Sequence, residues 1–464
     1  MLYRSTRGQA PGLDFRAATL AGLARDGGLY VPDHWPQLSA DDIAALAGLS
    51  YAETAARVLA PFVGDALTAD ALRDLCARAY GGFAHAAVTP LVQLDRQHWL
   101  LELFHGPTLA FKDVALQLLG LLFERFLAGQ ARPLTVIGAT SGDTGSAAIA
   151  ALARRHGIDI FMLHPHGRIS EVQRRQMTTV DAPNVHNIAV EGSFDDAQGI
   201  VKALFVAPGL ADRFALGAVN SINWARLAAQ IVYYFYAAVR LGAPVRRVAF
   251  SVPTGNFGDV FAGYAAWKMG LPIERLIVAT NVNDILHRAL ATGVYAATDV
   301  TPTAAPSMDI QVSSNFERLL FDLSVRDAAA TAAQMAGFER DRRLTLSPEQ
   351  RAGAALFASA RVDEAGMTEA MRWAWHAAGQ QIDPHTAIGL AAARGLAVAD
   401  DVPVVTLATA HPAKFPDAVQ QAIGVAPALP ARLGDLMHRA EHYAVLPATI
   451  DAVARHIAER ARAA

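Results

Sequence analysis

The chain has 464 residues, of which 53% are hydrophobic and 18% are charged, and its formal net charge is −3. This composition excludes a disordered chain, and the small net charge gives no reason to expect a nucleic acid as a partner. The length predicts two or three domains.

The sequence predicts neither export nor a membrane span. Its first ten residues, MLYRSTRGQA, lack the apolar core of a signal peptide. The longest apolar stretch, LAAQIVYYFYAAV at 227–239, is too short to cross a bilayer and predicts a buried helix. The single cysteine, Cys76, excludes an internal disulfide and has the helical spacing of a buried side chain. We expect a soluble cytoplasmic protein without a membrane partner, and the sequence leaves a monomer and a homodimer open.

Residues 1–90 predict a mainly helical region. The segments 39–49 and 68–80 have helical spacing, and each begins with a hydroxyl residue, Ser39 or Thr68, followed by acidic residues in the first turn. Such residues are typical of helix N-caps, where a side-chain oxygen accepts a hydrogen bond from a free backbone N–H group.

From residue 91 onward, short apolar strands alternate with amphipathic helices. This pattern is typical of the α/β class, with parallel or mixed sheets covered by helices on both faces. We expect one α/β domain at 91–240 and a second at 241–464, the second with a helical insertion at about 325–380. The order of the strands cannot be read from one sequence.

A lysine stands in an apolar setting in HGPTLAFKDVALQLLG, residues 105–120. Taken alone, the segment favours a solvent-exposed Lys112 at a helix start, with Asp113 as its ionic partner. The alternative is a buried lysine that is paired, neutralised or used covalently, because an unpaired ammonium is too costly to bury. Two glycine turns further along the chain bear on this choice.

The first glycine turn, TVIGATSGDTGSAAIAAL at 135–152, joins a predicted strand to a predicted helix. Open α/β sheets bind ligands at such positions, where free N–H groups and hydroxyls suit an anion such as a carboxylate. A capped helix start without a ligand would use the same residue types. The candidate residues are Thr140, Ser141, Gly142, Asp143, Thr144 and Gly145.

The second glycine turn, SVPTGNFGD at 251–259, is again followed by a predicted helix. Gly255 and Gly258 permit a positive φ and a close backbone approach, which predicts a phosphate cradle. No Lys-Ser/Thr pair follows the last glycine, and the G-x-G-x-x-G pattern is absent, so the turn is neither a Walker loop nor a dinucleotide fingerprint. This favours the phosphate of a cofactor over that of ATP.

Together these features suggest pyridoxal phosphate (PLP), which needs an amine for its Schiff base, a phosphate anchor and a partner for its ring nitrogen. That partner could be Thr409 or Thr406, near the end of a predicted strand in VTLATAHPAKF. HPH at 164–166 has no third ligand nearby, so we expect a loop there and no metal site.

At this point the chain resembles the longer threonine synthases, which are PLP enzymes of the tryptophan-synthase-β-like fold, fold type II. The resemblance rests on eight motifs that occur in the same order: YRSTRG, DGGLYVP, HGPTLAFKD, TSGDTG, SVPTGNFGD, SMDIQVSSNFERLLF, DPHTAIG and LATAHPAKFP. One motif alone is weak evidence, whereas eight in order from end to end are highly specific.

The resemblance implies a role for each cofactor residue. Lys112 would form the Schiff base, Thr409 would face the ring nitrogen, and Asp143 would lie beside the PLP hydroxyl, where many wider fold type II relatives carry Asn. The cofactor phosphate would be held by Gly255, Asn256, Phe257, Gly258 and Asp259.

The resemblance also implies the substrate, O-phospho-L-homoserine. Asn220, Ser221 and Arg226 in VNSINWAR match the family positions that hold its phosphate; without the family, Arg226 would be interpreted as a surface residue paired with an acidic neighbour. The implied reaction converts O-phospho-L-homoserine and water to L-threonine and phosphate, with Lys112 as the base for the α-proton.

Two alternatives stay open from the sequence. One is another fold type II enzyme, either a serine/threonine dehydratase or a phospholyase that eliminates phosphate without making threonine. The residues around Arg226 argue against a dehydratase, but they do not exclude a phospholyase. The other alternative is a non-catalytic relative that acts as a binding scaffold, against which the intact Lys112 argues.

Overall fold

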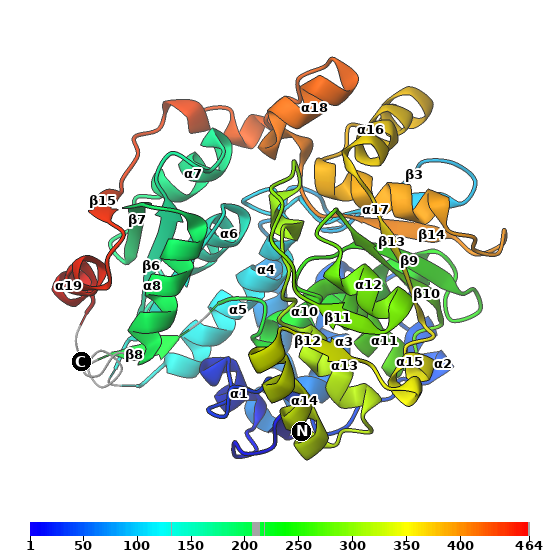
Figure 1. Cartoon of the computed structure of the whole chain (residues 1–464), viewed down its shortest axis with the longest axis horizontal. Helices are drawn as coiled ribbons and strands as arrows, with labels where there is room; N and C mark the ends of the chain where they lie inside the picture. The colour runs from blue at the N-terminus through cyan, green and yellow to red at the C-terminus, as the bar shows by residue number, and fades with distance from the viewer. Residues whose placement is uncertain (131, 207–213, 218, 463–464) are drawn as a thin grey trace.

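The computed structural model describes residues 1–130, 132–206, 214–217 and 219–462. Most of its strands lie in two larger sheets that stand next to each other, with helices between and around them (Figure 1). This arrangement confirms the predicted α/β class.

The first sheet has six strands in the order β13-β10-β9-β14-β4-β3. All neighbours are parallel except β3 and β4, which are antiparallel. The strands are β3 (Leu91–Gln93), β4 (His98–Glu102), β9 (Val248–Pro253), β10 (Ile273–Thr280), β13 (Phe357–Arg361) and β14 (Val404–Ala408).

The second sheet has five parallel strands in the order β15-β7-β6-β5-β8. They are β5 (Leu134–Ala139), β6 (Ile158–Pro165), β7 (Val185–Glu191), β8 (Ala215–Gly217) and β15 (Ala444–Pro447). Two small antiparallel pairs complete the described strands: β1 (Tyr3–Ser5) with β2 (Tyr30–Pro32), and β11 (Val294–Ala296) with β12 (Arg343–Thr345).

The two sheets do not divide the chain at residue 240. Strands β3 and β4 precede the second sheet in sequence, yet they join the first sheet, and β15 returns from the C-terminal part of the chain to pair with β7. The expected boundaries of 91–240 and 241–464 are wrong in this respect, because strand neighbours are set by long-range packing that a local pattern does not encode.

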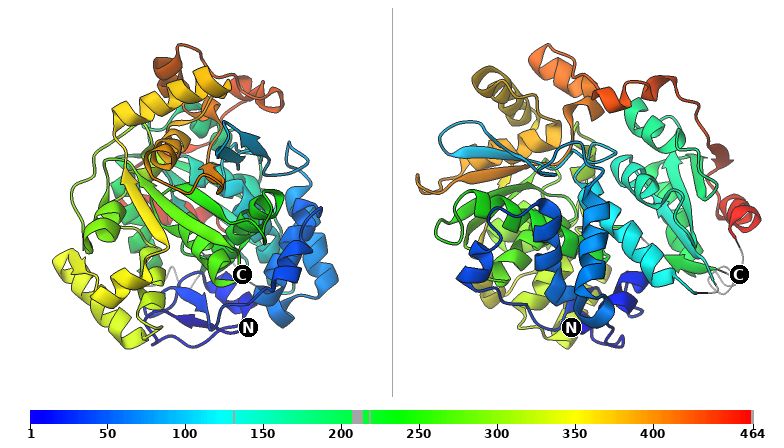
Figure 2. Two further views of the ribbon diagram at one scale, coloured as in Figure 1. Left: turned by 90° about the vertical axis from the view of Figure 1, so that its right-hand side faces the viewer. Right: turned by 180° about the vertical axis from the view of Figure 1, so that it is seen from behind.

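The N-terminal helices are α1 (Phe15–Ala21), α2 (Ala40–Ala44), α3 (Tyr51–Val63) and α4 (Ala69–Tyr80). Ser39 and Thr68 cap α2 and α4 through their side chains, as predicted. These helices, blue in Figure 2, cover the back of the molecule and pack on two central helices, α5 (Lys112–Leu127) and α10 (Trp224–Arg240).

Helix α10 is buried from Trp224 to Val239, which confirms the prediction for the long apolar stretch. Its side chains share one hydrophobic core with α3, α4, α5 and α11 (Gly258–Lys268). Among the described residues, no helix is both long enough and apolar enough to span a membrane.

The remaining helices follow or cover the strands. Around the second sheet they are α6 (Asp143–Leu152), α7 (Glu171–Thr178), α8 (Phe194–Val206) and α19 (Ile450–Arg460). The others are α12 (Ile285–Thr292), α13 (Phe316–Leu323), α14 (Ala328–Asp341), α15 (Pro348–Gly353), α16 (Glu364–Ala378), α17 (Pro384–Gly395) and α18 (Pro416–Ile423).

The segment 325–380 is not purely helical, contrary to expectation. It contains β12 and also β13, which pairs with β10 at the edge of the first sheet. The β13 sequence, FASAR, is half-exposed and has no continuous apolar run, so its strand character comes from its pairing with β10.

Candidate active site

The site lies where strands end and helices begin. Strand β5 leads through the first glycine turn into α6, and β9 leads through the second into α11. Strand β14 ends just before Thr409, whose carbonyl oxygen accepts a hydrogen bond of 2.8 Å from the N–H group of Phe111, the residue before Lys112. The fold therefore brings Lys112, Asp143 and Thr409 to the carboxyl ends of the strands, where α/β proteins bind ligands.

Lys112 is buried at the start of α5, with 7% of its surface exposed. Its Nζ lies 3.3 Å from Asp143 Oδ2 and 3.4 Å from Ser307 Oγ. Burial lowers the pKa of Lys112; Asp143 opposes this effect, while the cations Arg226 and Lys414 add to it. The interpretation of Lys112 as a solvent-exposed residue is wrong, and the buried alternative is confirmed.

Asp113 is not the partner of Lys112. Its two carboxylate oxygens accept hydrogen bonds from the N–H group and the hydroxyl of Thr108, at 2.8 and 2.7 Å. Asp113 therefore fixes the loop before α5, while Lys112 points to Asp143 at the start of α6.

Asp143 lies at the centre of a charged network. Its Oδ1 accepts hydrogen bonds from Lys414 Nζ at 2.7 Å and from Gln173 Nε2 at 2.8 Å. Burial alone raises the pKa of Asp143, but Lys414 and Lys112 outweigh it and hold the pKa well below its usual range. The sequence did not single out Lys414 or Gln173; a lysine inside the apolar motif ATAHPAKFP was the signal for the first.

The first glycine turn is built around Thr140, whose Oγ1 accepts hydrogen bonds of 2.9 Å from the N–H groups of both Gly142 and Gly145. Thr140 is 1% exposed, and its hydroxyl oxygen shapes the turn, so its role as an anion-binding residue stays a prediction. Ser141 and Thr144 are half-buried at the start of α6, which no side chain of the described residues caps.

The second glycine turn differs from the expectation in its backbone. Phe257, not either glycine, adopts the left-handed conformation, with φ of 63°. The glycines are needed for space instead: a Cβ at Gly255 would lie 2.7 Å from the carbonyl oxygen of Ser307, and one at Gly258 would lie 3.2 Å from Asn315 Nδ2. The prediction of positive φ at the two glycines is therefore wrong.

No side chain in the described part of the chain caps the start of α11 at this second turn, so N–H groups of its first turn remain available to an anion. The carboxylate of Asp259 faces away, into α10, where it accepts hydrogen bonds from the hydroxyls of Tyr233 and Tyr234. Only the backbone of Asp259 can therefore serve the turn.

These residues fit PLP. A buried amine suits covalent attachment. The uncapped start of α11, next to the glycines of the second turn, suits a phosphate. The hydroxyl of Thr409, mostly buried beside the start of α5, makes no hydrogen bond to the described residues and could serve a ring nitrogen. Thr406 cannot, because it is fully buried inside β14.

Arg226 is a buried guanidinium without a carboxylate partner among the described residues. It is 4% exposed, and its Nη1 donates to the carbonyl oxygen of Val219 at 3.0 Å, while its buried Nε has no hydrogen-bond acceptor in the described structure. Burial lowers its pKa to about 10. The interpretation as an exposed surface arginine is wrong, and such a buried donor fork is suited to an anionic ligand.

Asn220 and Ser221 precede α10 near the second glycine turn. Asn220 is exposed, whereas Ser221 is half-buried with its Oγ 3.4 Å from Ser314 Oγ. Ser314 also contacts Asn256 Oδ1 at 3.4 Å, so a serine that the sequence did not single out links the two segments.

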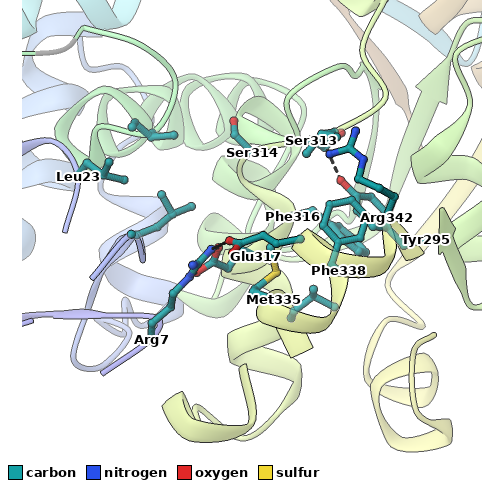
Figure 3. A pocket seen from close by; sticks show the side chains of 16 residues that line it. Arg7, Leu23, Tyr295, Ser313, Ser314, Phe316, Glu317, Met335, Phe338 and Arg342 are labelled. Carbon is teal, nitrogen blue, oxygen red and sulfur yellow. Dashed lines mark hydrogen bonds and ion pairs between the residues drawn. The ribbon is translucent and has the colours of Figure 1, made fainter. Parts of the chain in front are cut away.

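A cavity of about 280 Å³ lies behind this link, between α13, α14 and the N-terminal region (Figure 3). In Figure 3, Arg7 and Glu317 are in contact on one side and Ser313 and Ser314 lie on another. Lys112 and Asp143 do not line this cavity, so it is not the place of the amine chemistry. It approaches the second glycine turn only through Ser313 and Ser314, which contact Gly255 and Asn256.

Comparisons with known proteins agree with this geometry. Three family models match: "Threonine synthase N terminus" at residues 2–80, "Pyridoxal-phosphate dependent enzyme" at 83–410 and "Threonine synthase, C-terminal" at 386–457. A threonine synthase from Pseudomonas aeruginosa is 55% identical, with 96% of each chain covered.

Solved structures give the same result. A PLP-bound threonine synthase from Brucella melitensis is 51% identical over 100% of both chains, with a TM-score of 0.97. Threonine synthase from yeast is 39% identical over 99% of this chain and 98% of that one, with a TM-score of 0.93. The chain therefore belongs to the threonine synthase family of PLP-dependent enzymes.

Proposed function

We propose that this enzyme converts O-phospho-L-homoserine and water to L-threonine and phosphate, with Lys112 as the residue that binds PLP covalently. The observation that carries the proposal is the buried Lys112 amine, 3.3 Å from Asp143, with the Arg226 guanidinium, which has no carboxylate partner among the described residues, near enough to lower the pKa of Lys112. The single cysteine supports a location in the reducing cytoplasm. We propose that the enzyme acts there as a monomer or a homodimer.

The cofactor would be held at three places besides Lys112. Backbone N–H groups at the second glycine turn, 255–259, would bind its phosphate, the hydroxyl of Thr409 would face its ring nitrogen, and Asp143 would lie beside its hydroxyl. Bound PLP supplies an electron sink that stabilises negative charge on the carbon atoms near the substrate amine.

Lys112 is suited to move protons. Burial lowers its pKa, which favours the neutral amine that a general base requires. With the substrate in the site, the Lys112 Nζ would take the proton from the substrate α-carbon and then act at the β-carbon. Phosphate leaves from the γ-carbon and water adds at the β-carbon.

Arg226 would bind the substrate phosphate, together with Asn220 and Ser221. The guanidinium is already buried without a carboxylate partner among the described residues, so a phosphate can complete its hydrogen bonds without displacing a carboxylate. The carboxylate of the substrate would lie at the start of α6, near Ser141 and Thr144, where N–H groups and hydroxyls favour an anion.

A product assay tests this proposal. The purified protein with PLP and O-phospho-L-homoserine should release L-threonine and phosphate in equal amounts, and the Lys112→Ala variant should release neither. Phosphate without threonine would identify a phospholyase instead, and no turnover by the PLP-loaded protein would contradict the proposed substrate.

A further inference from the structure

Lys414 is a second lysine buried in the site. The chain has four lysines, and two of them, Lys112 and Lys414, meet at one carboxylate. Lys414 is the last residue of a short 3-10 helix, η3 (Pro412–Lys414), that follows β14, and it is 0% exposed. Its Nζ also donates to the carbonyl oxygen of Thr108 at 2.8 Å, so this cation is fixed on two sides.

The two lysines share Asp143 unequally. Lys414 lies 2.7 Å from Oδ1, to which Gln173 also donates, whereas Lys112 lies 3.3 Å from Oδ2. The shorter contact belongs to Lys414. Asp143 therefore keeps a cationic partner even when Lys112 is neutral.

This arrangement matters for the chemistry of Lys112. A buried carboxylate next to an amine favours the ammonium form, which has no lone pair for attack or for proton transfer. A second cation on the same carboxylate opposes that effect. Without Lys414, Asp143 would act on Lys112 with its full charge.

The other charged groups near Lys112 do not replace Lys414. Arg226 on α10 acts in the same direction but forms no ion pair with Asp143. Asp113 on α5 is held by Thr108. On α17, His385 accepts a hydrogen bond from the Ser307 N–H group and contacts Asp383 through its other ring nitrogen.

We propose that Lys414 is a positioning residue that neutralises Asp143 and so keeps the Lys112 amine unprotonated for its reaction with PLP. The inference rests on the proposed role of Lys112 as the attachment site. It assigns a role to a residue outside the attachment site, phosphate cradle and substrate-phosphate group described above.

The rate at which PLP attaches to the apo-protein reports the protonation of Lys112. In this reaction the lone pair of a neutral Nζ attacks the aldehyde carbon, a C=N bond forms, and the aldehyde oxygen leaves as water. Stopped-flow absorbance at a series of pH values gives the pH at which the attachment rate is half of its maximum, called the midpoint below. Lys414→Met should move this midpoint upward by about 1 pH unit or more, so that attachment below it slows about tenfold.

Three further variants separate charge from structure. Lys268, the last residue of α11, forms another ion pair, of 3.3 Å with the buried carboxylate of Asp322 on α13; Lys268→Met breaks it and should leave the midpoint unchanged. Asp143→Asn should lower the midpoint, because it leaves Lys112 among cations only. The double variant Asp143→Asn/Lys414→Met should have a midpoint above that of Asp143→Asn, because the positive charge of Lys414 also acts on Lys112 directly. It keeps the test valid if Lys414→Met alone does not fold.

The outcomes distinguish the inference from the proposed function. If Lys414→Met attaches PLP at Lys112 with the parent midpoint, or if the double variant matches Asp143→Asn, Lys414 is only structural. If the parent protein does not attach PLP at Lys112 at all, the proposed function fails instead.

Discussion

Ser221 packs against the Gly258 position: a Cβ at Gly258 would lie 3.8 Å from the Cβ of Ser221. The segment proposed for the substrate phosphate and the turn proposed for the cofactor phosphate are therefore neighbours. Asn315 completes the contact, with its Nδ2 3.2 Å from the same Gly258 position. The two proposed anion sites therefore adjoin each other, and we expect a side chain added at this turn to disturb both.

Gly255→Ala should weaken PLP binding. The added Cβ would lie 2.7 Å from the backbone oxygen of Ser307, whose hydroxyl contacts Lys112, so the Ser307 segment must shift. Overpacking of this kind costs about 1–3 kcal/mol. A PLP titration should therefore show an affinity for PLP that is lower by about fivefold to a hundredfold. Gly337→Ala on α14 is the matched control, because nothing lies within 4 Å of its Cβ position. Equal PLP affinity in the two variants would place the cradle elsewhere.

Arg226→Ala should reduce kcat/KM for O-phospho-L-homoserine by about tenfold to a hundredfold, since a charge-assisted hydrogen bond contributes about 1.5–3 kcal/mol. PLP content and slow side reactions of serine or threonine should change little. Arg226→Lys should recover part of the loss, because a point charge does not reproduce the planar fork. Equal losses on phosphorylated and unphosphorylated substrates would show that Arg226 supports the fold or the cofactor instead.

Thr409→Val should leave PLP bound but change its absorbance spectrum and lower turnover. The substitution keeps the shape and removes the hydroxyl, while the backbone carbonyl that accepts from Phe111 remains. Thr406→Val is the matched control: its buried Oγ1 has no hydrogen-bond partner in the described structure, so removing it should cost no stability and leave the spectrum unchanged. A parent-like spectrum for Thr409→Val would remove the assignment.

Asp259 should make stability depend on pH. Burial raises its pKa to about 6 from an ordinary 3.8, despite the hydrogen bonds from Tyr233 and Tyr234. Because the folded-state pKa is the higher one, this contribution to stability is complete below about pH 3.8 and is lost as the pH rises through about 6. Asp259→Asn keeps an acceptor but does not titrate.

Denaturant unfolding of the parent and of Asp259→Asn at several pH values checks this prediction. Between about pH 4 and about pH 7, the free energy of unfolding of the parent should fall relative to that of the variant, by up to about 3 kcal/mol. Curves that stay parallel would mean that Asp259 is already ionised in the folded protein at low pH.

Much of the fold was predictable because its signals are local. The N-caps Ser39 and Thr68 and the buried helix at 227–239 depend on side chains within a few turns, and these predictions are confirmed. The strand order and the edge strand β13 were not predictable, since they depend on which distant strand offers its free edge. The local sequence of FASAR, which contains two alanines, favours a helix, but its pairing with β10 makes it a strand.

The site was predictable to the same extent. Motifs placed Lys112, Asp143 and Thr409 at strand ends and helix starts, and the fold brings them together. Lys414 was missed as a member of the network because its partner Asp143 lies far away in sequence. The glycines of the second turn suggested positive φ, but the constraint that requires glycine there is the nearby Ser307 backbone, which only the folded structure shows.

The most direct test of the account is to trap the cofactor on its lysine. The PLP-loaded protein is reduced with borohydride and digested, and the mass of each lysine-containing peptide is measured by mass spectrometry. Because the chain has only four lysines, Lys112, Lys202, Lys268 and Lys414, the label can be assigned without ambiguity. The account predicts the label on Lys112 and none on the Lys112→Ala protein; a label on Lys414, or on either of the other two lysines, would contradict it.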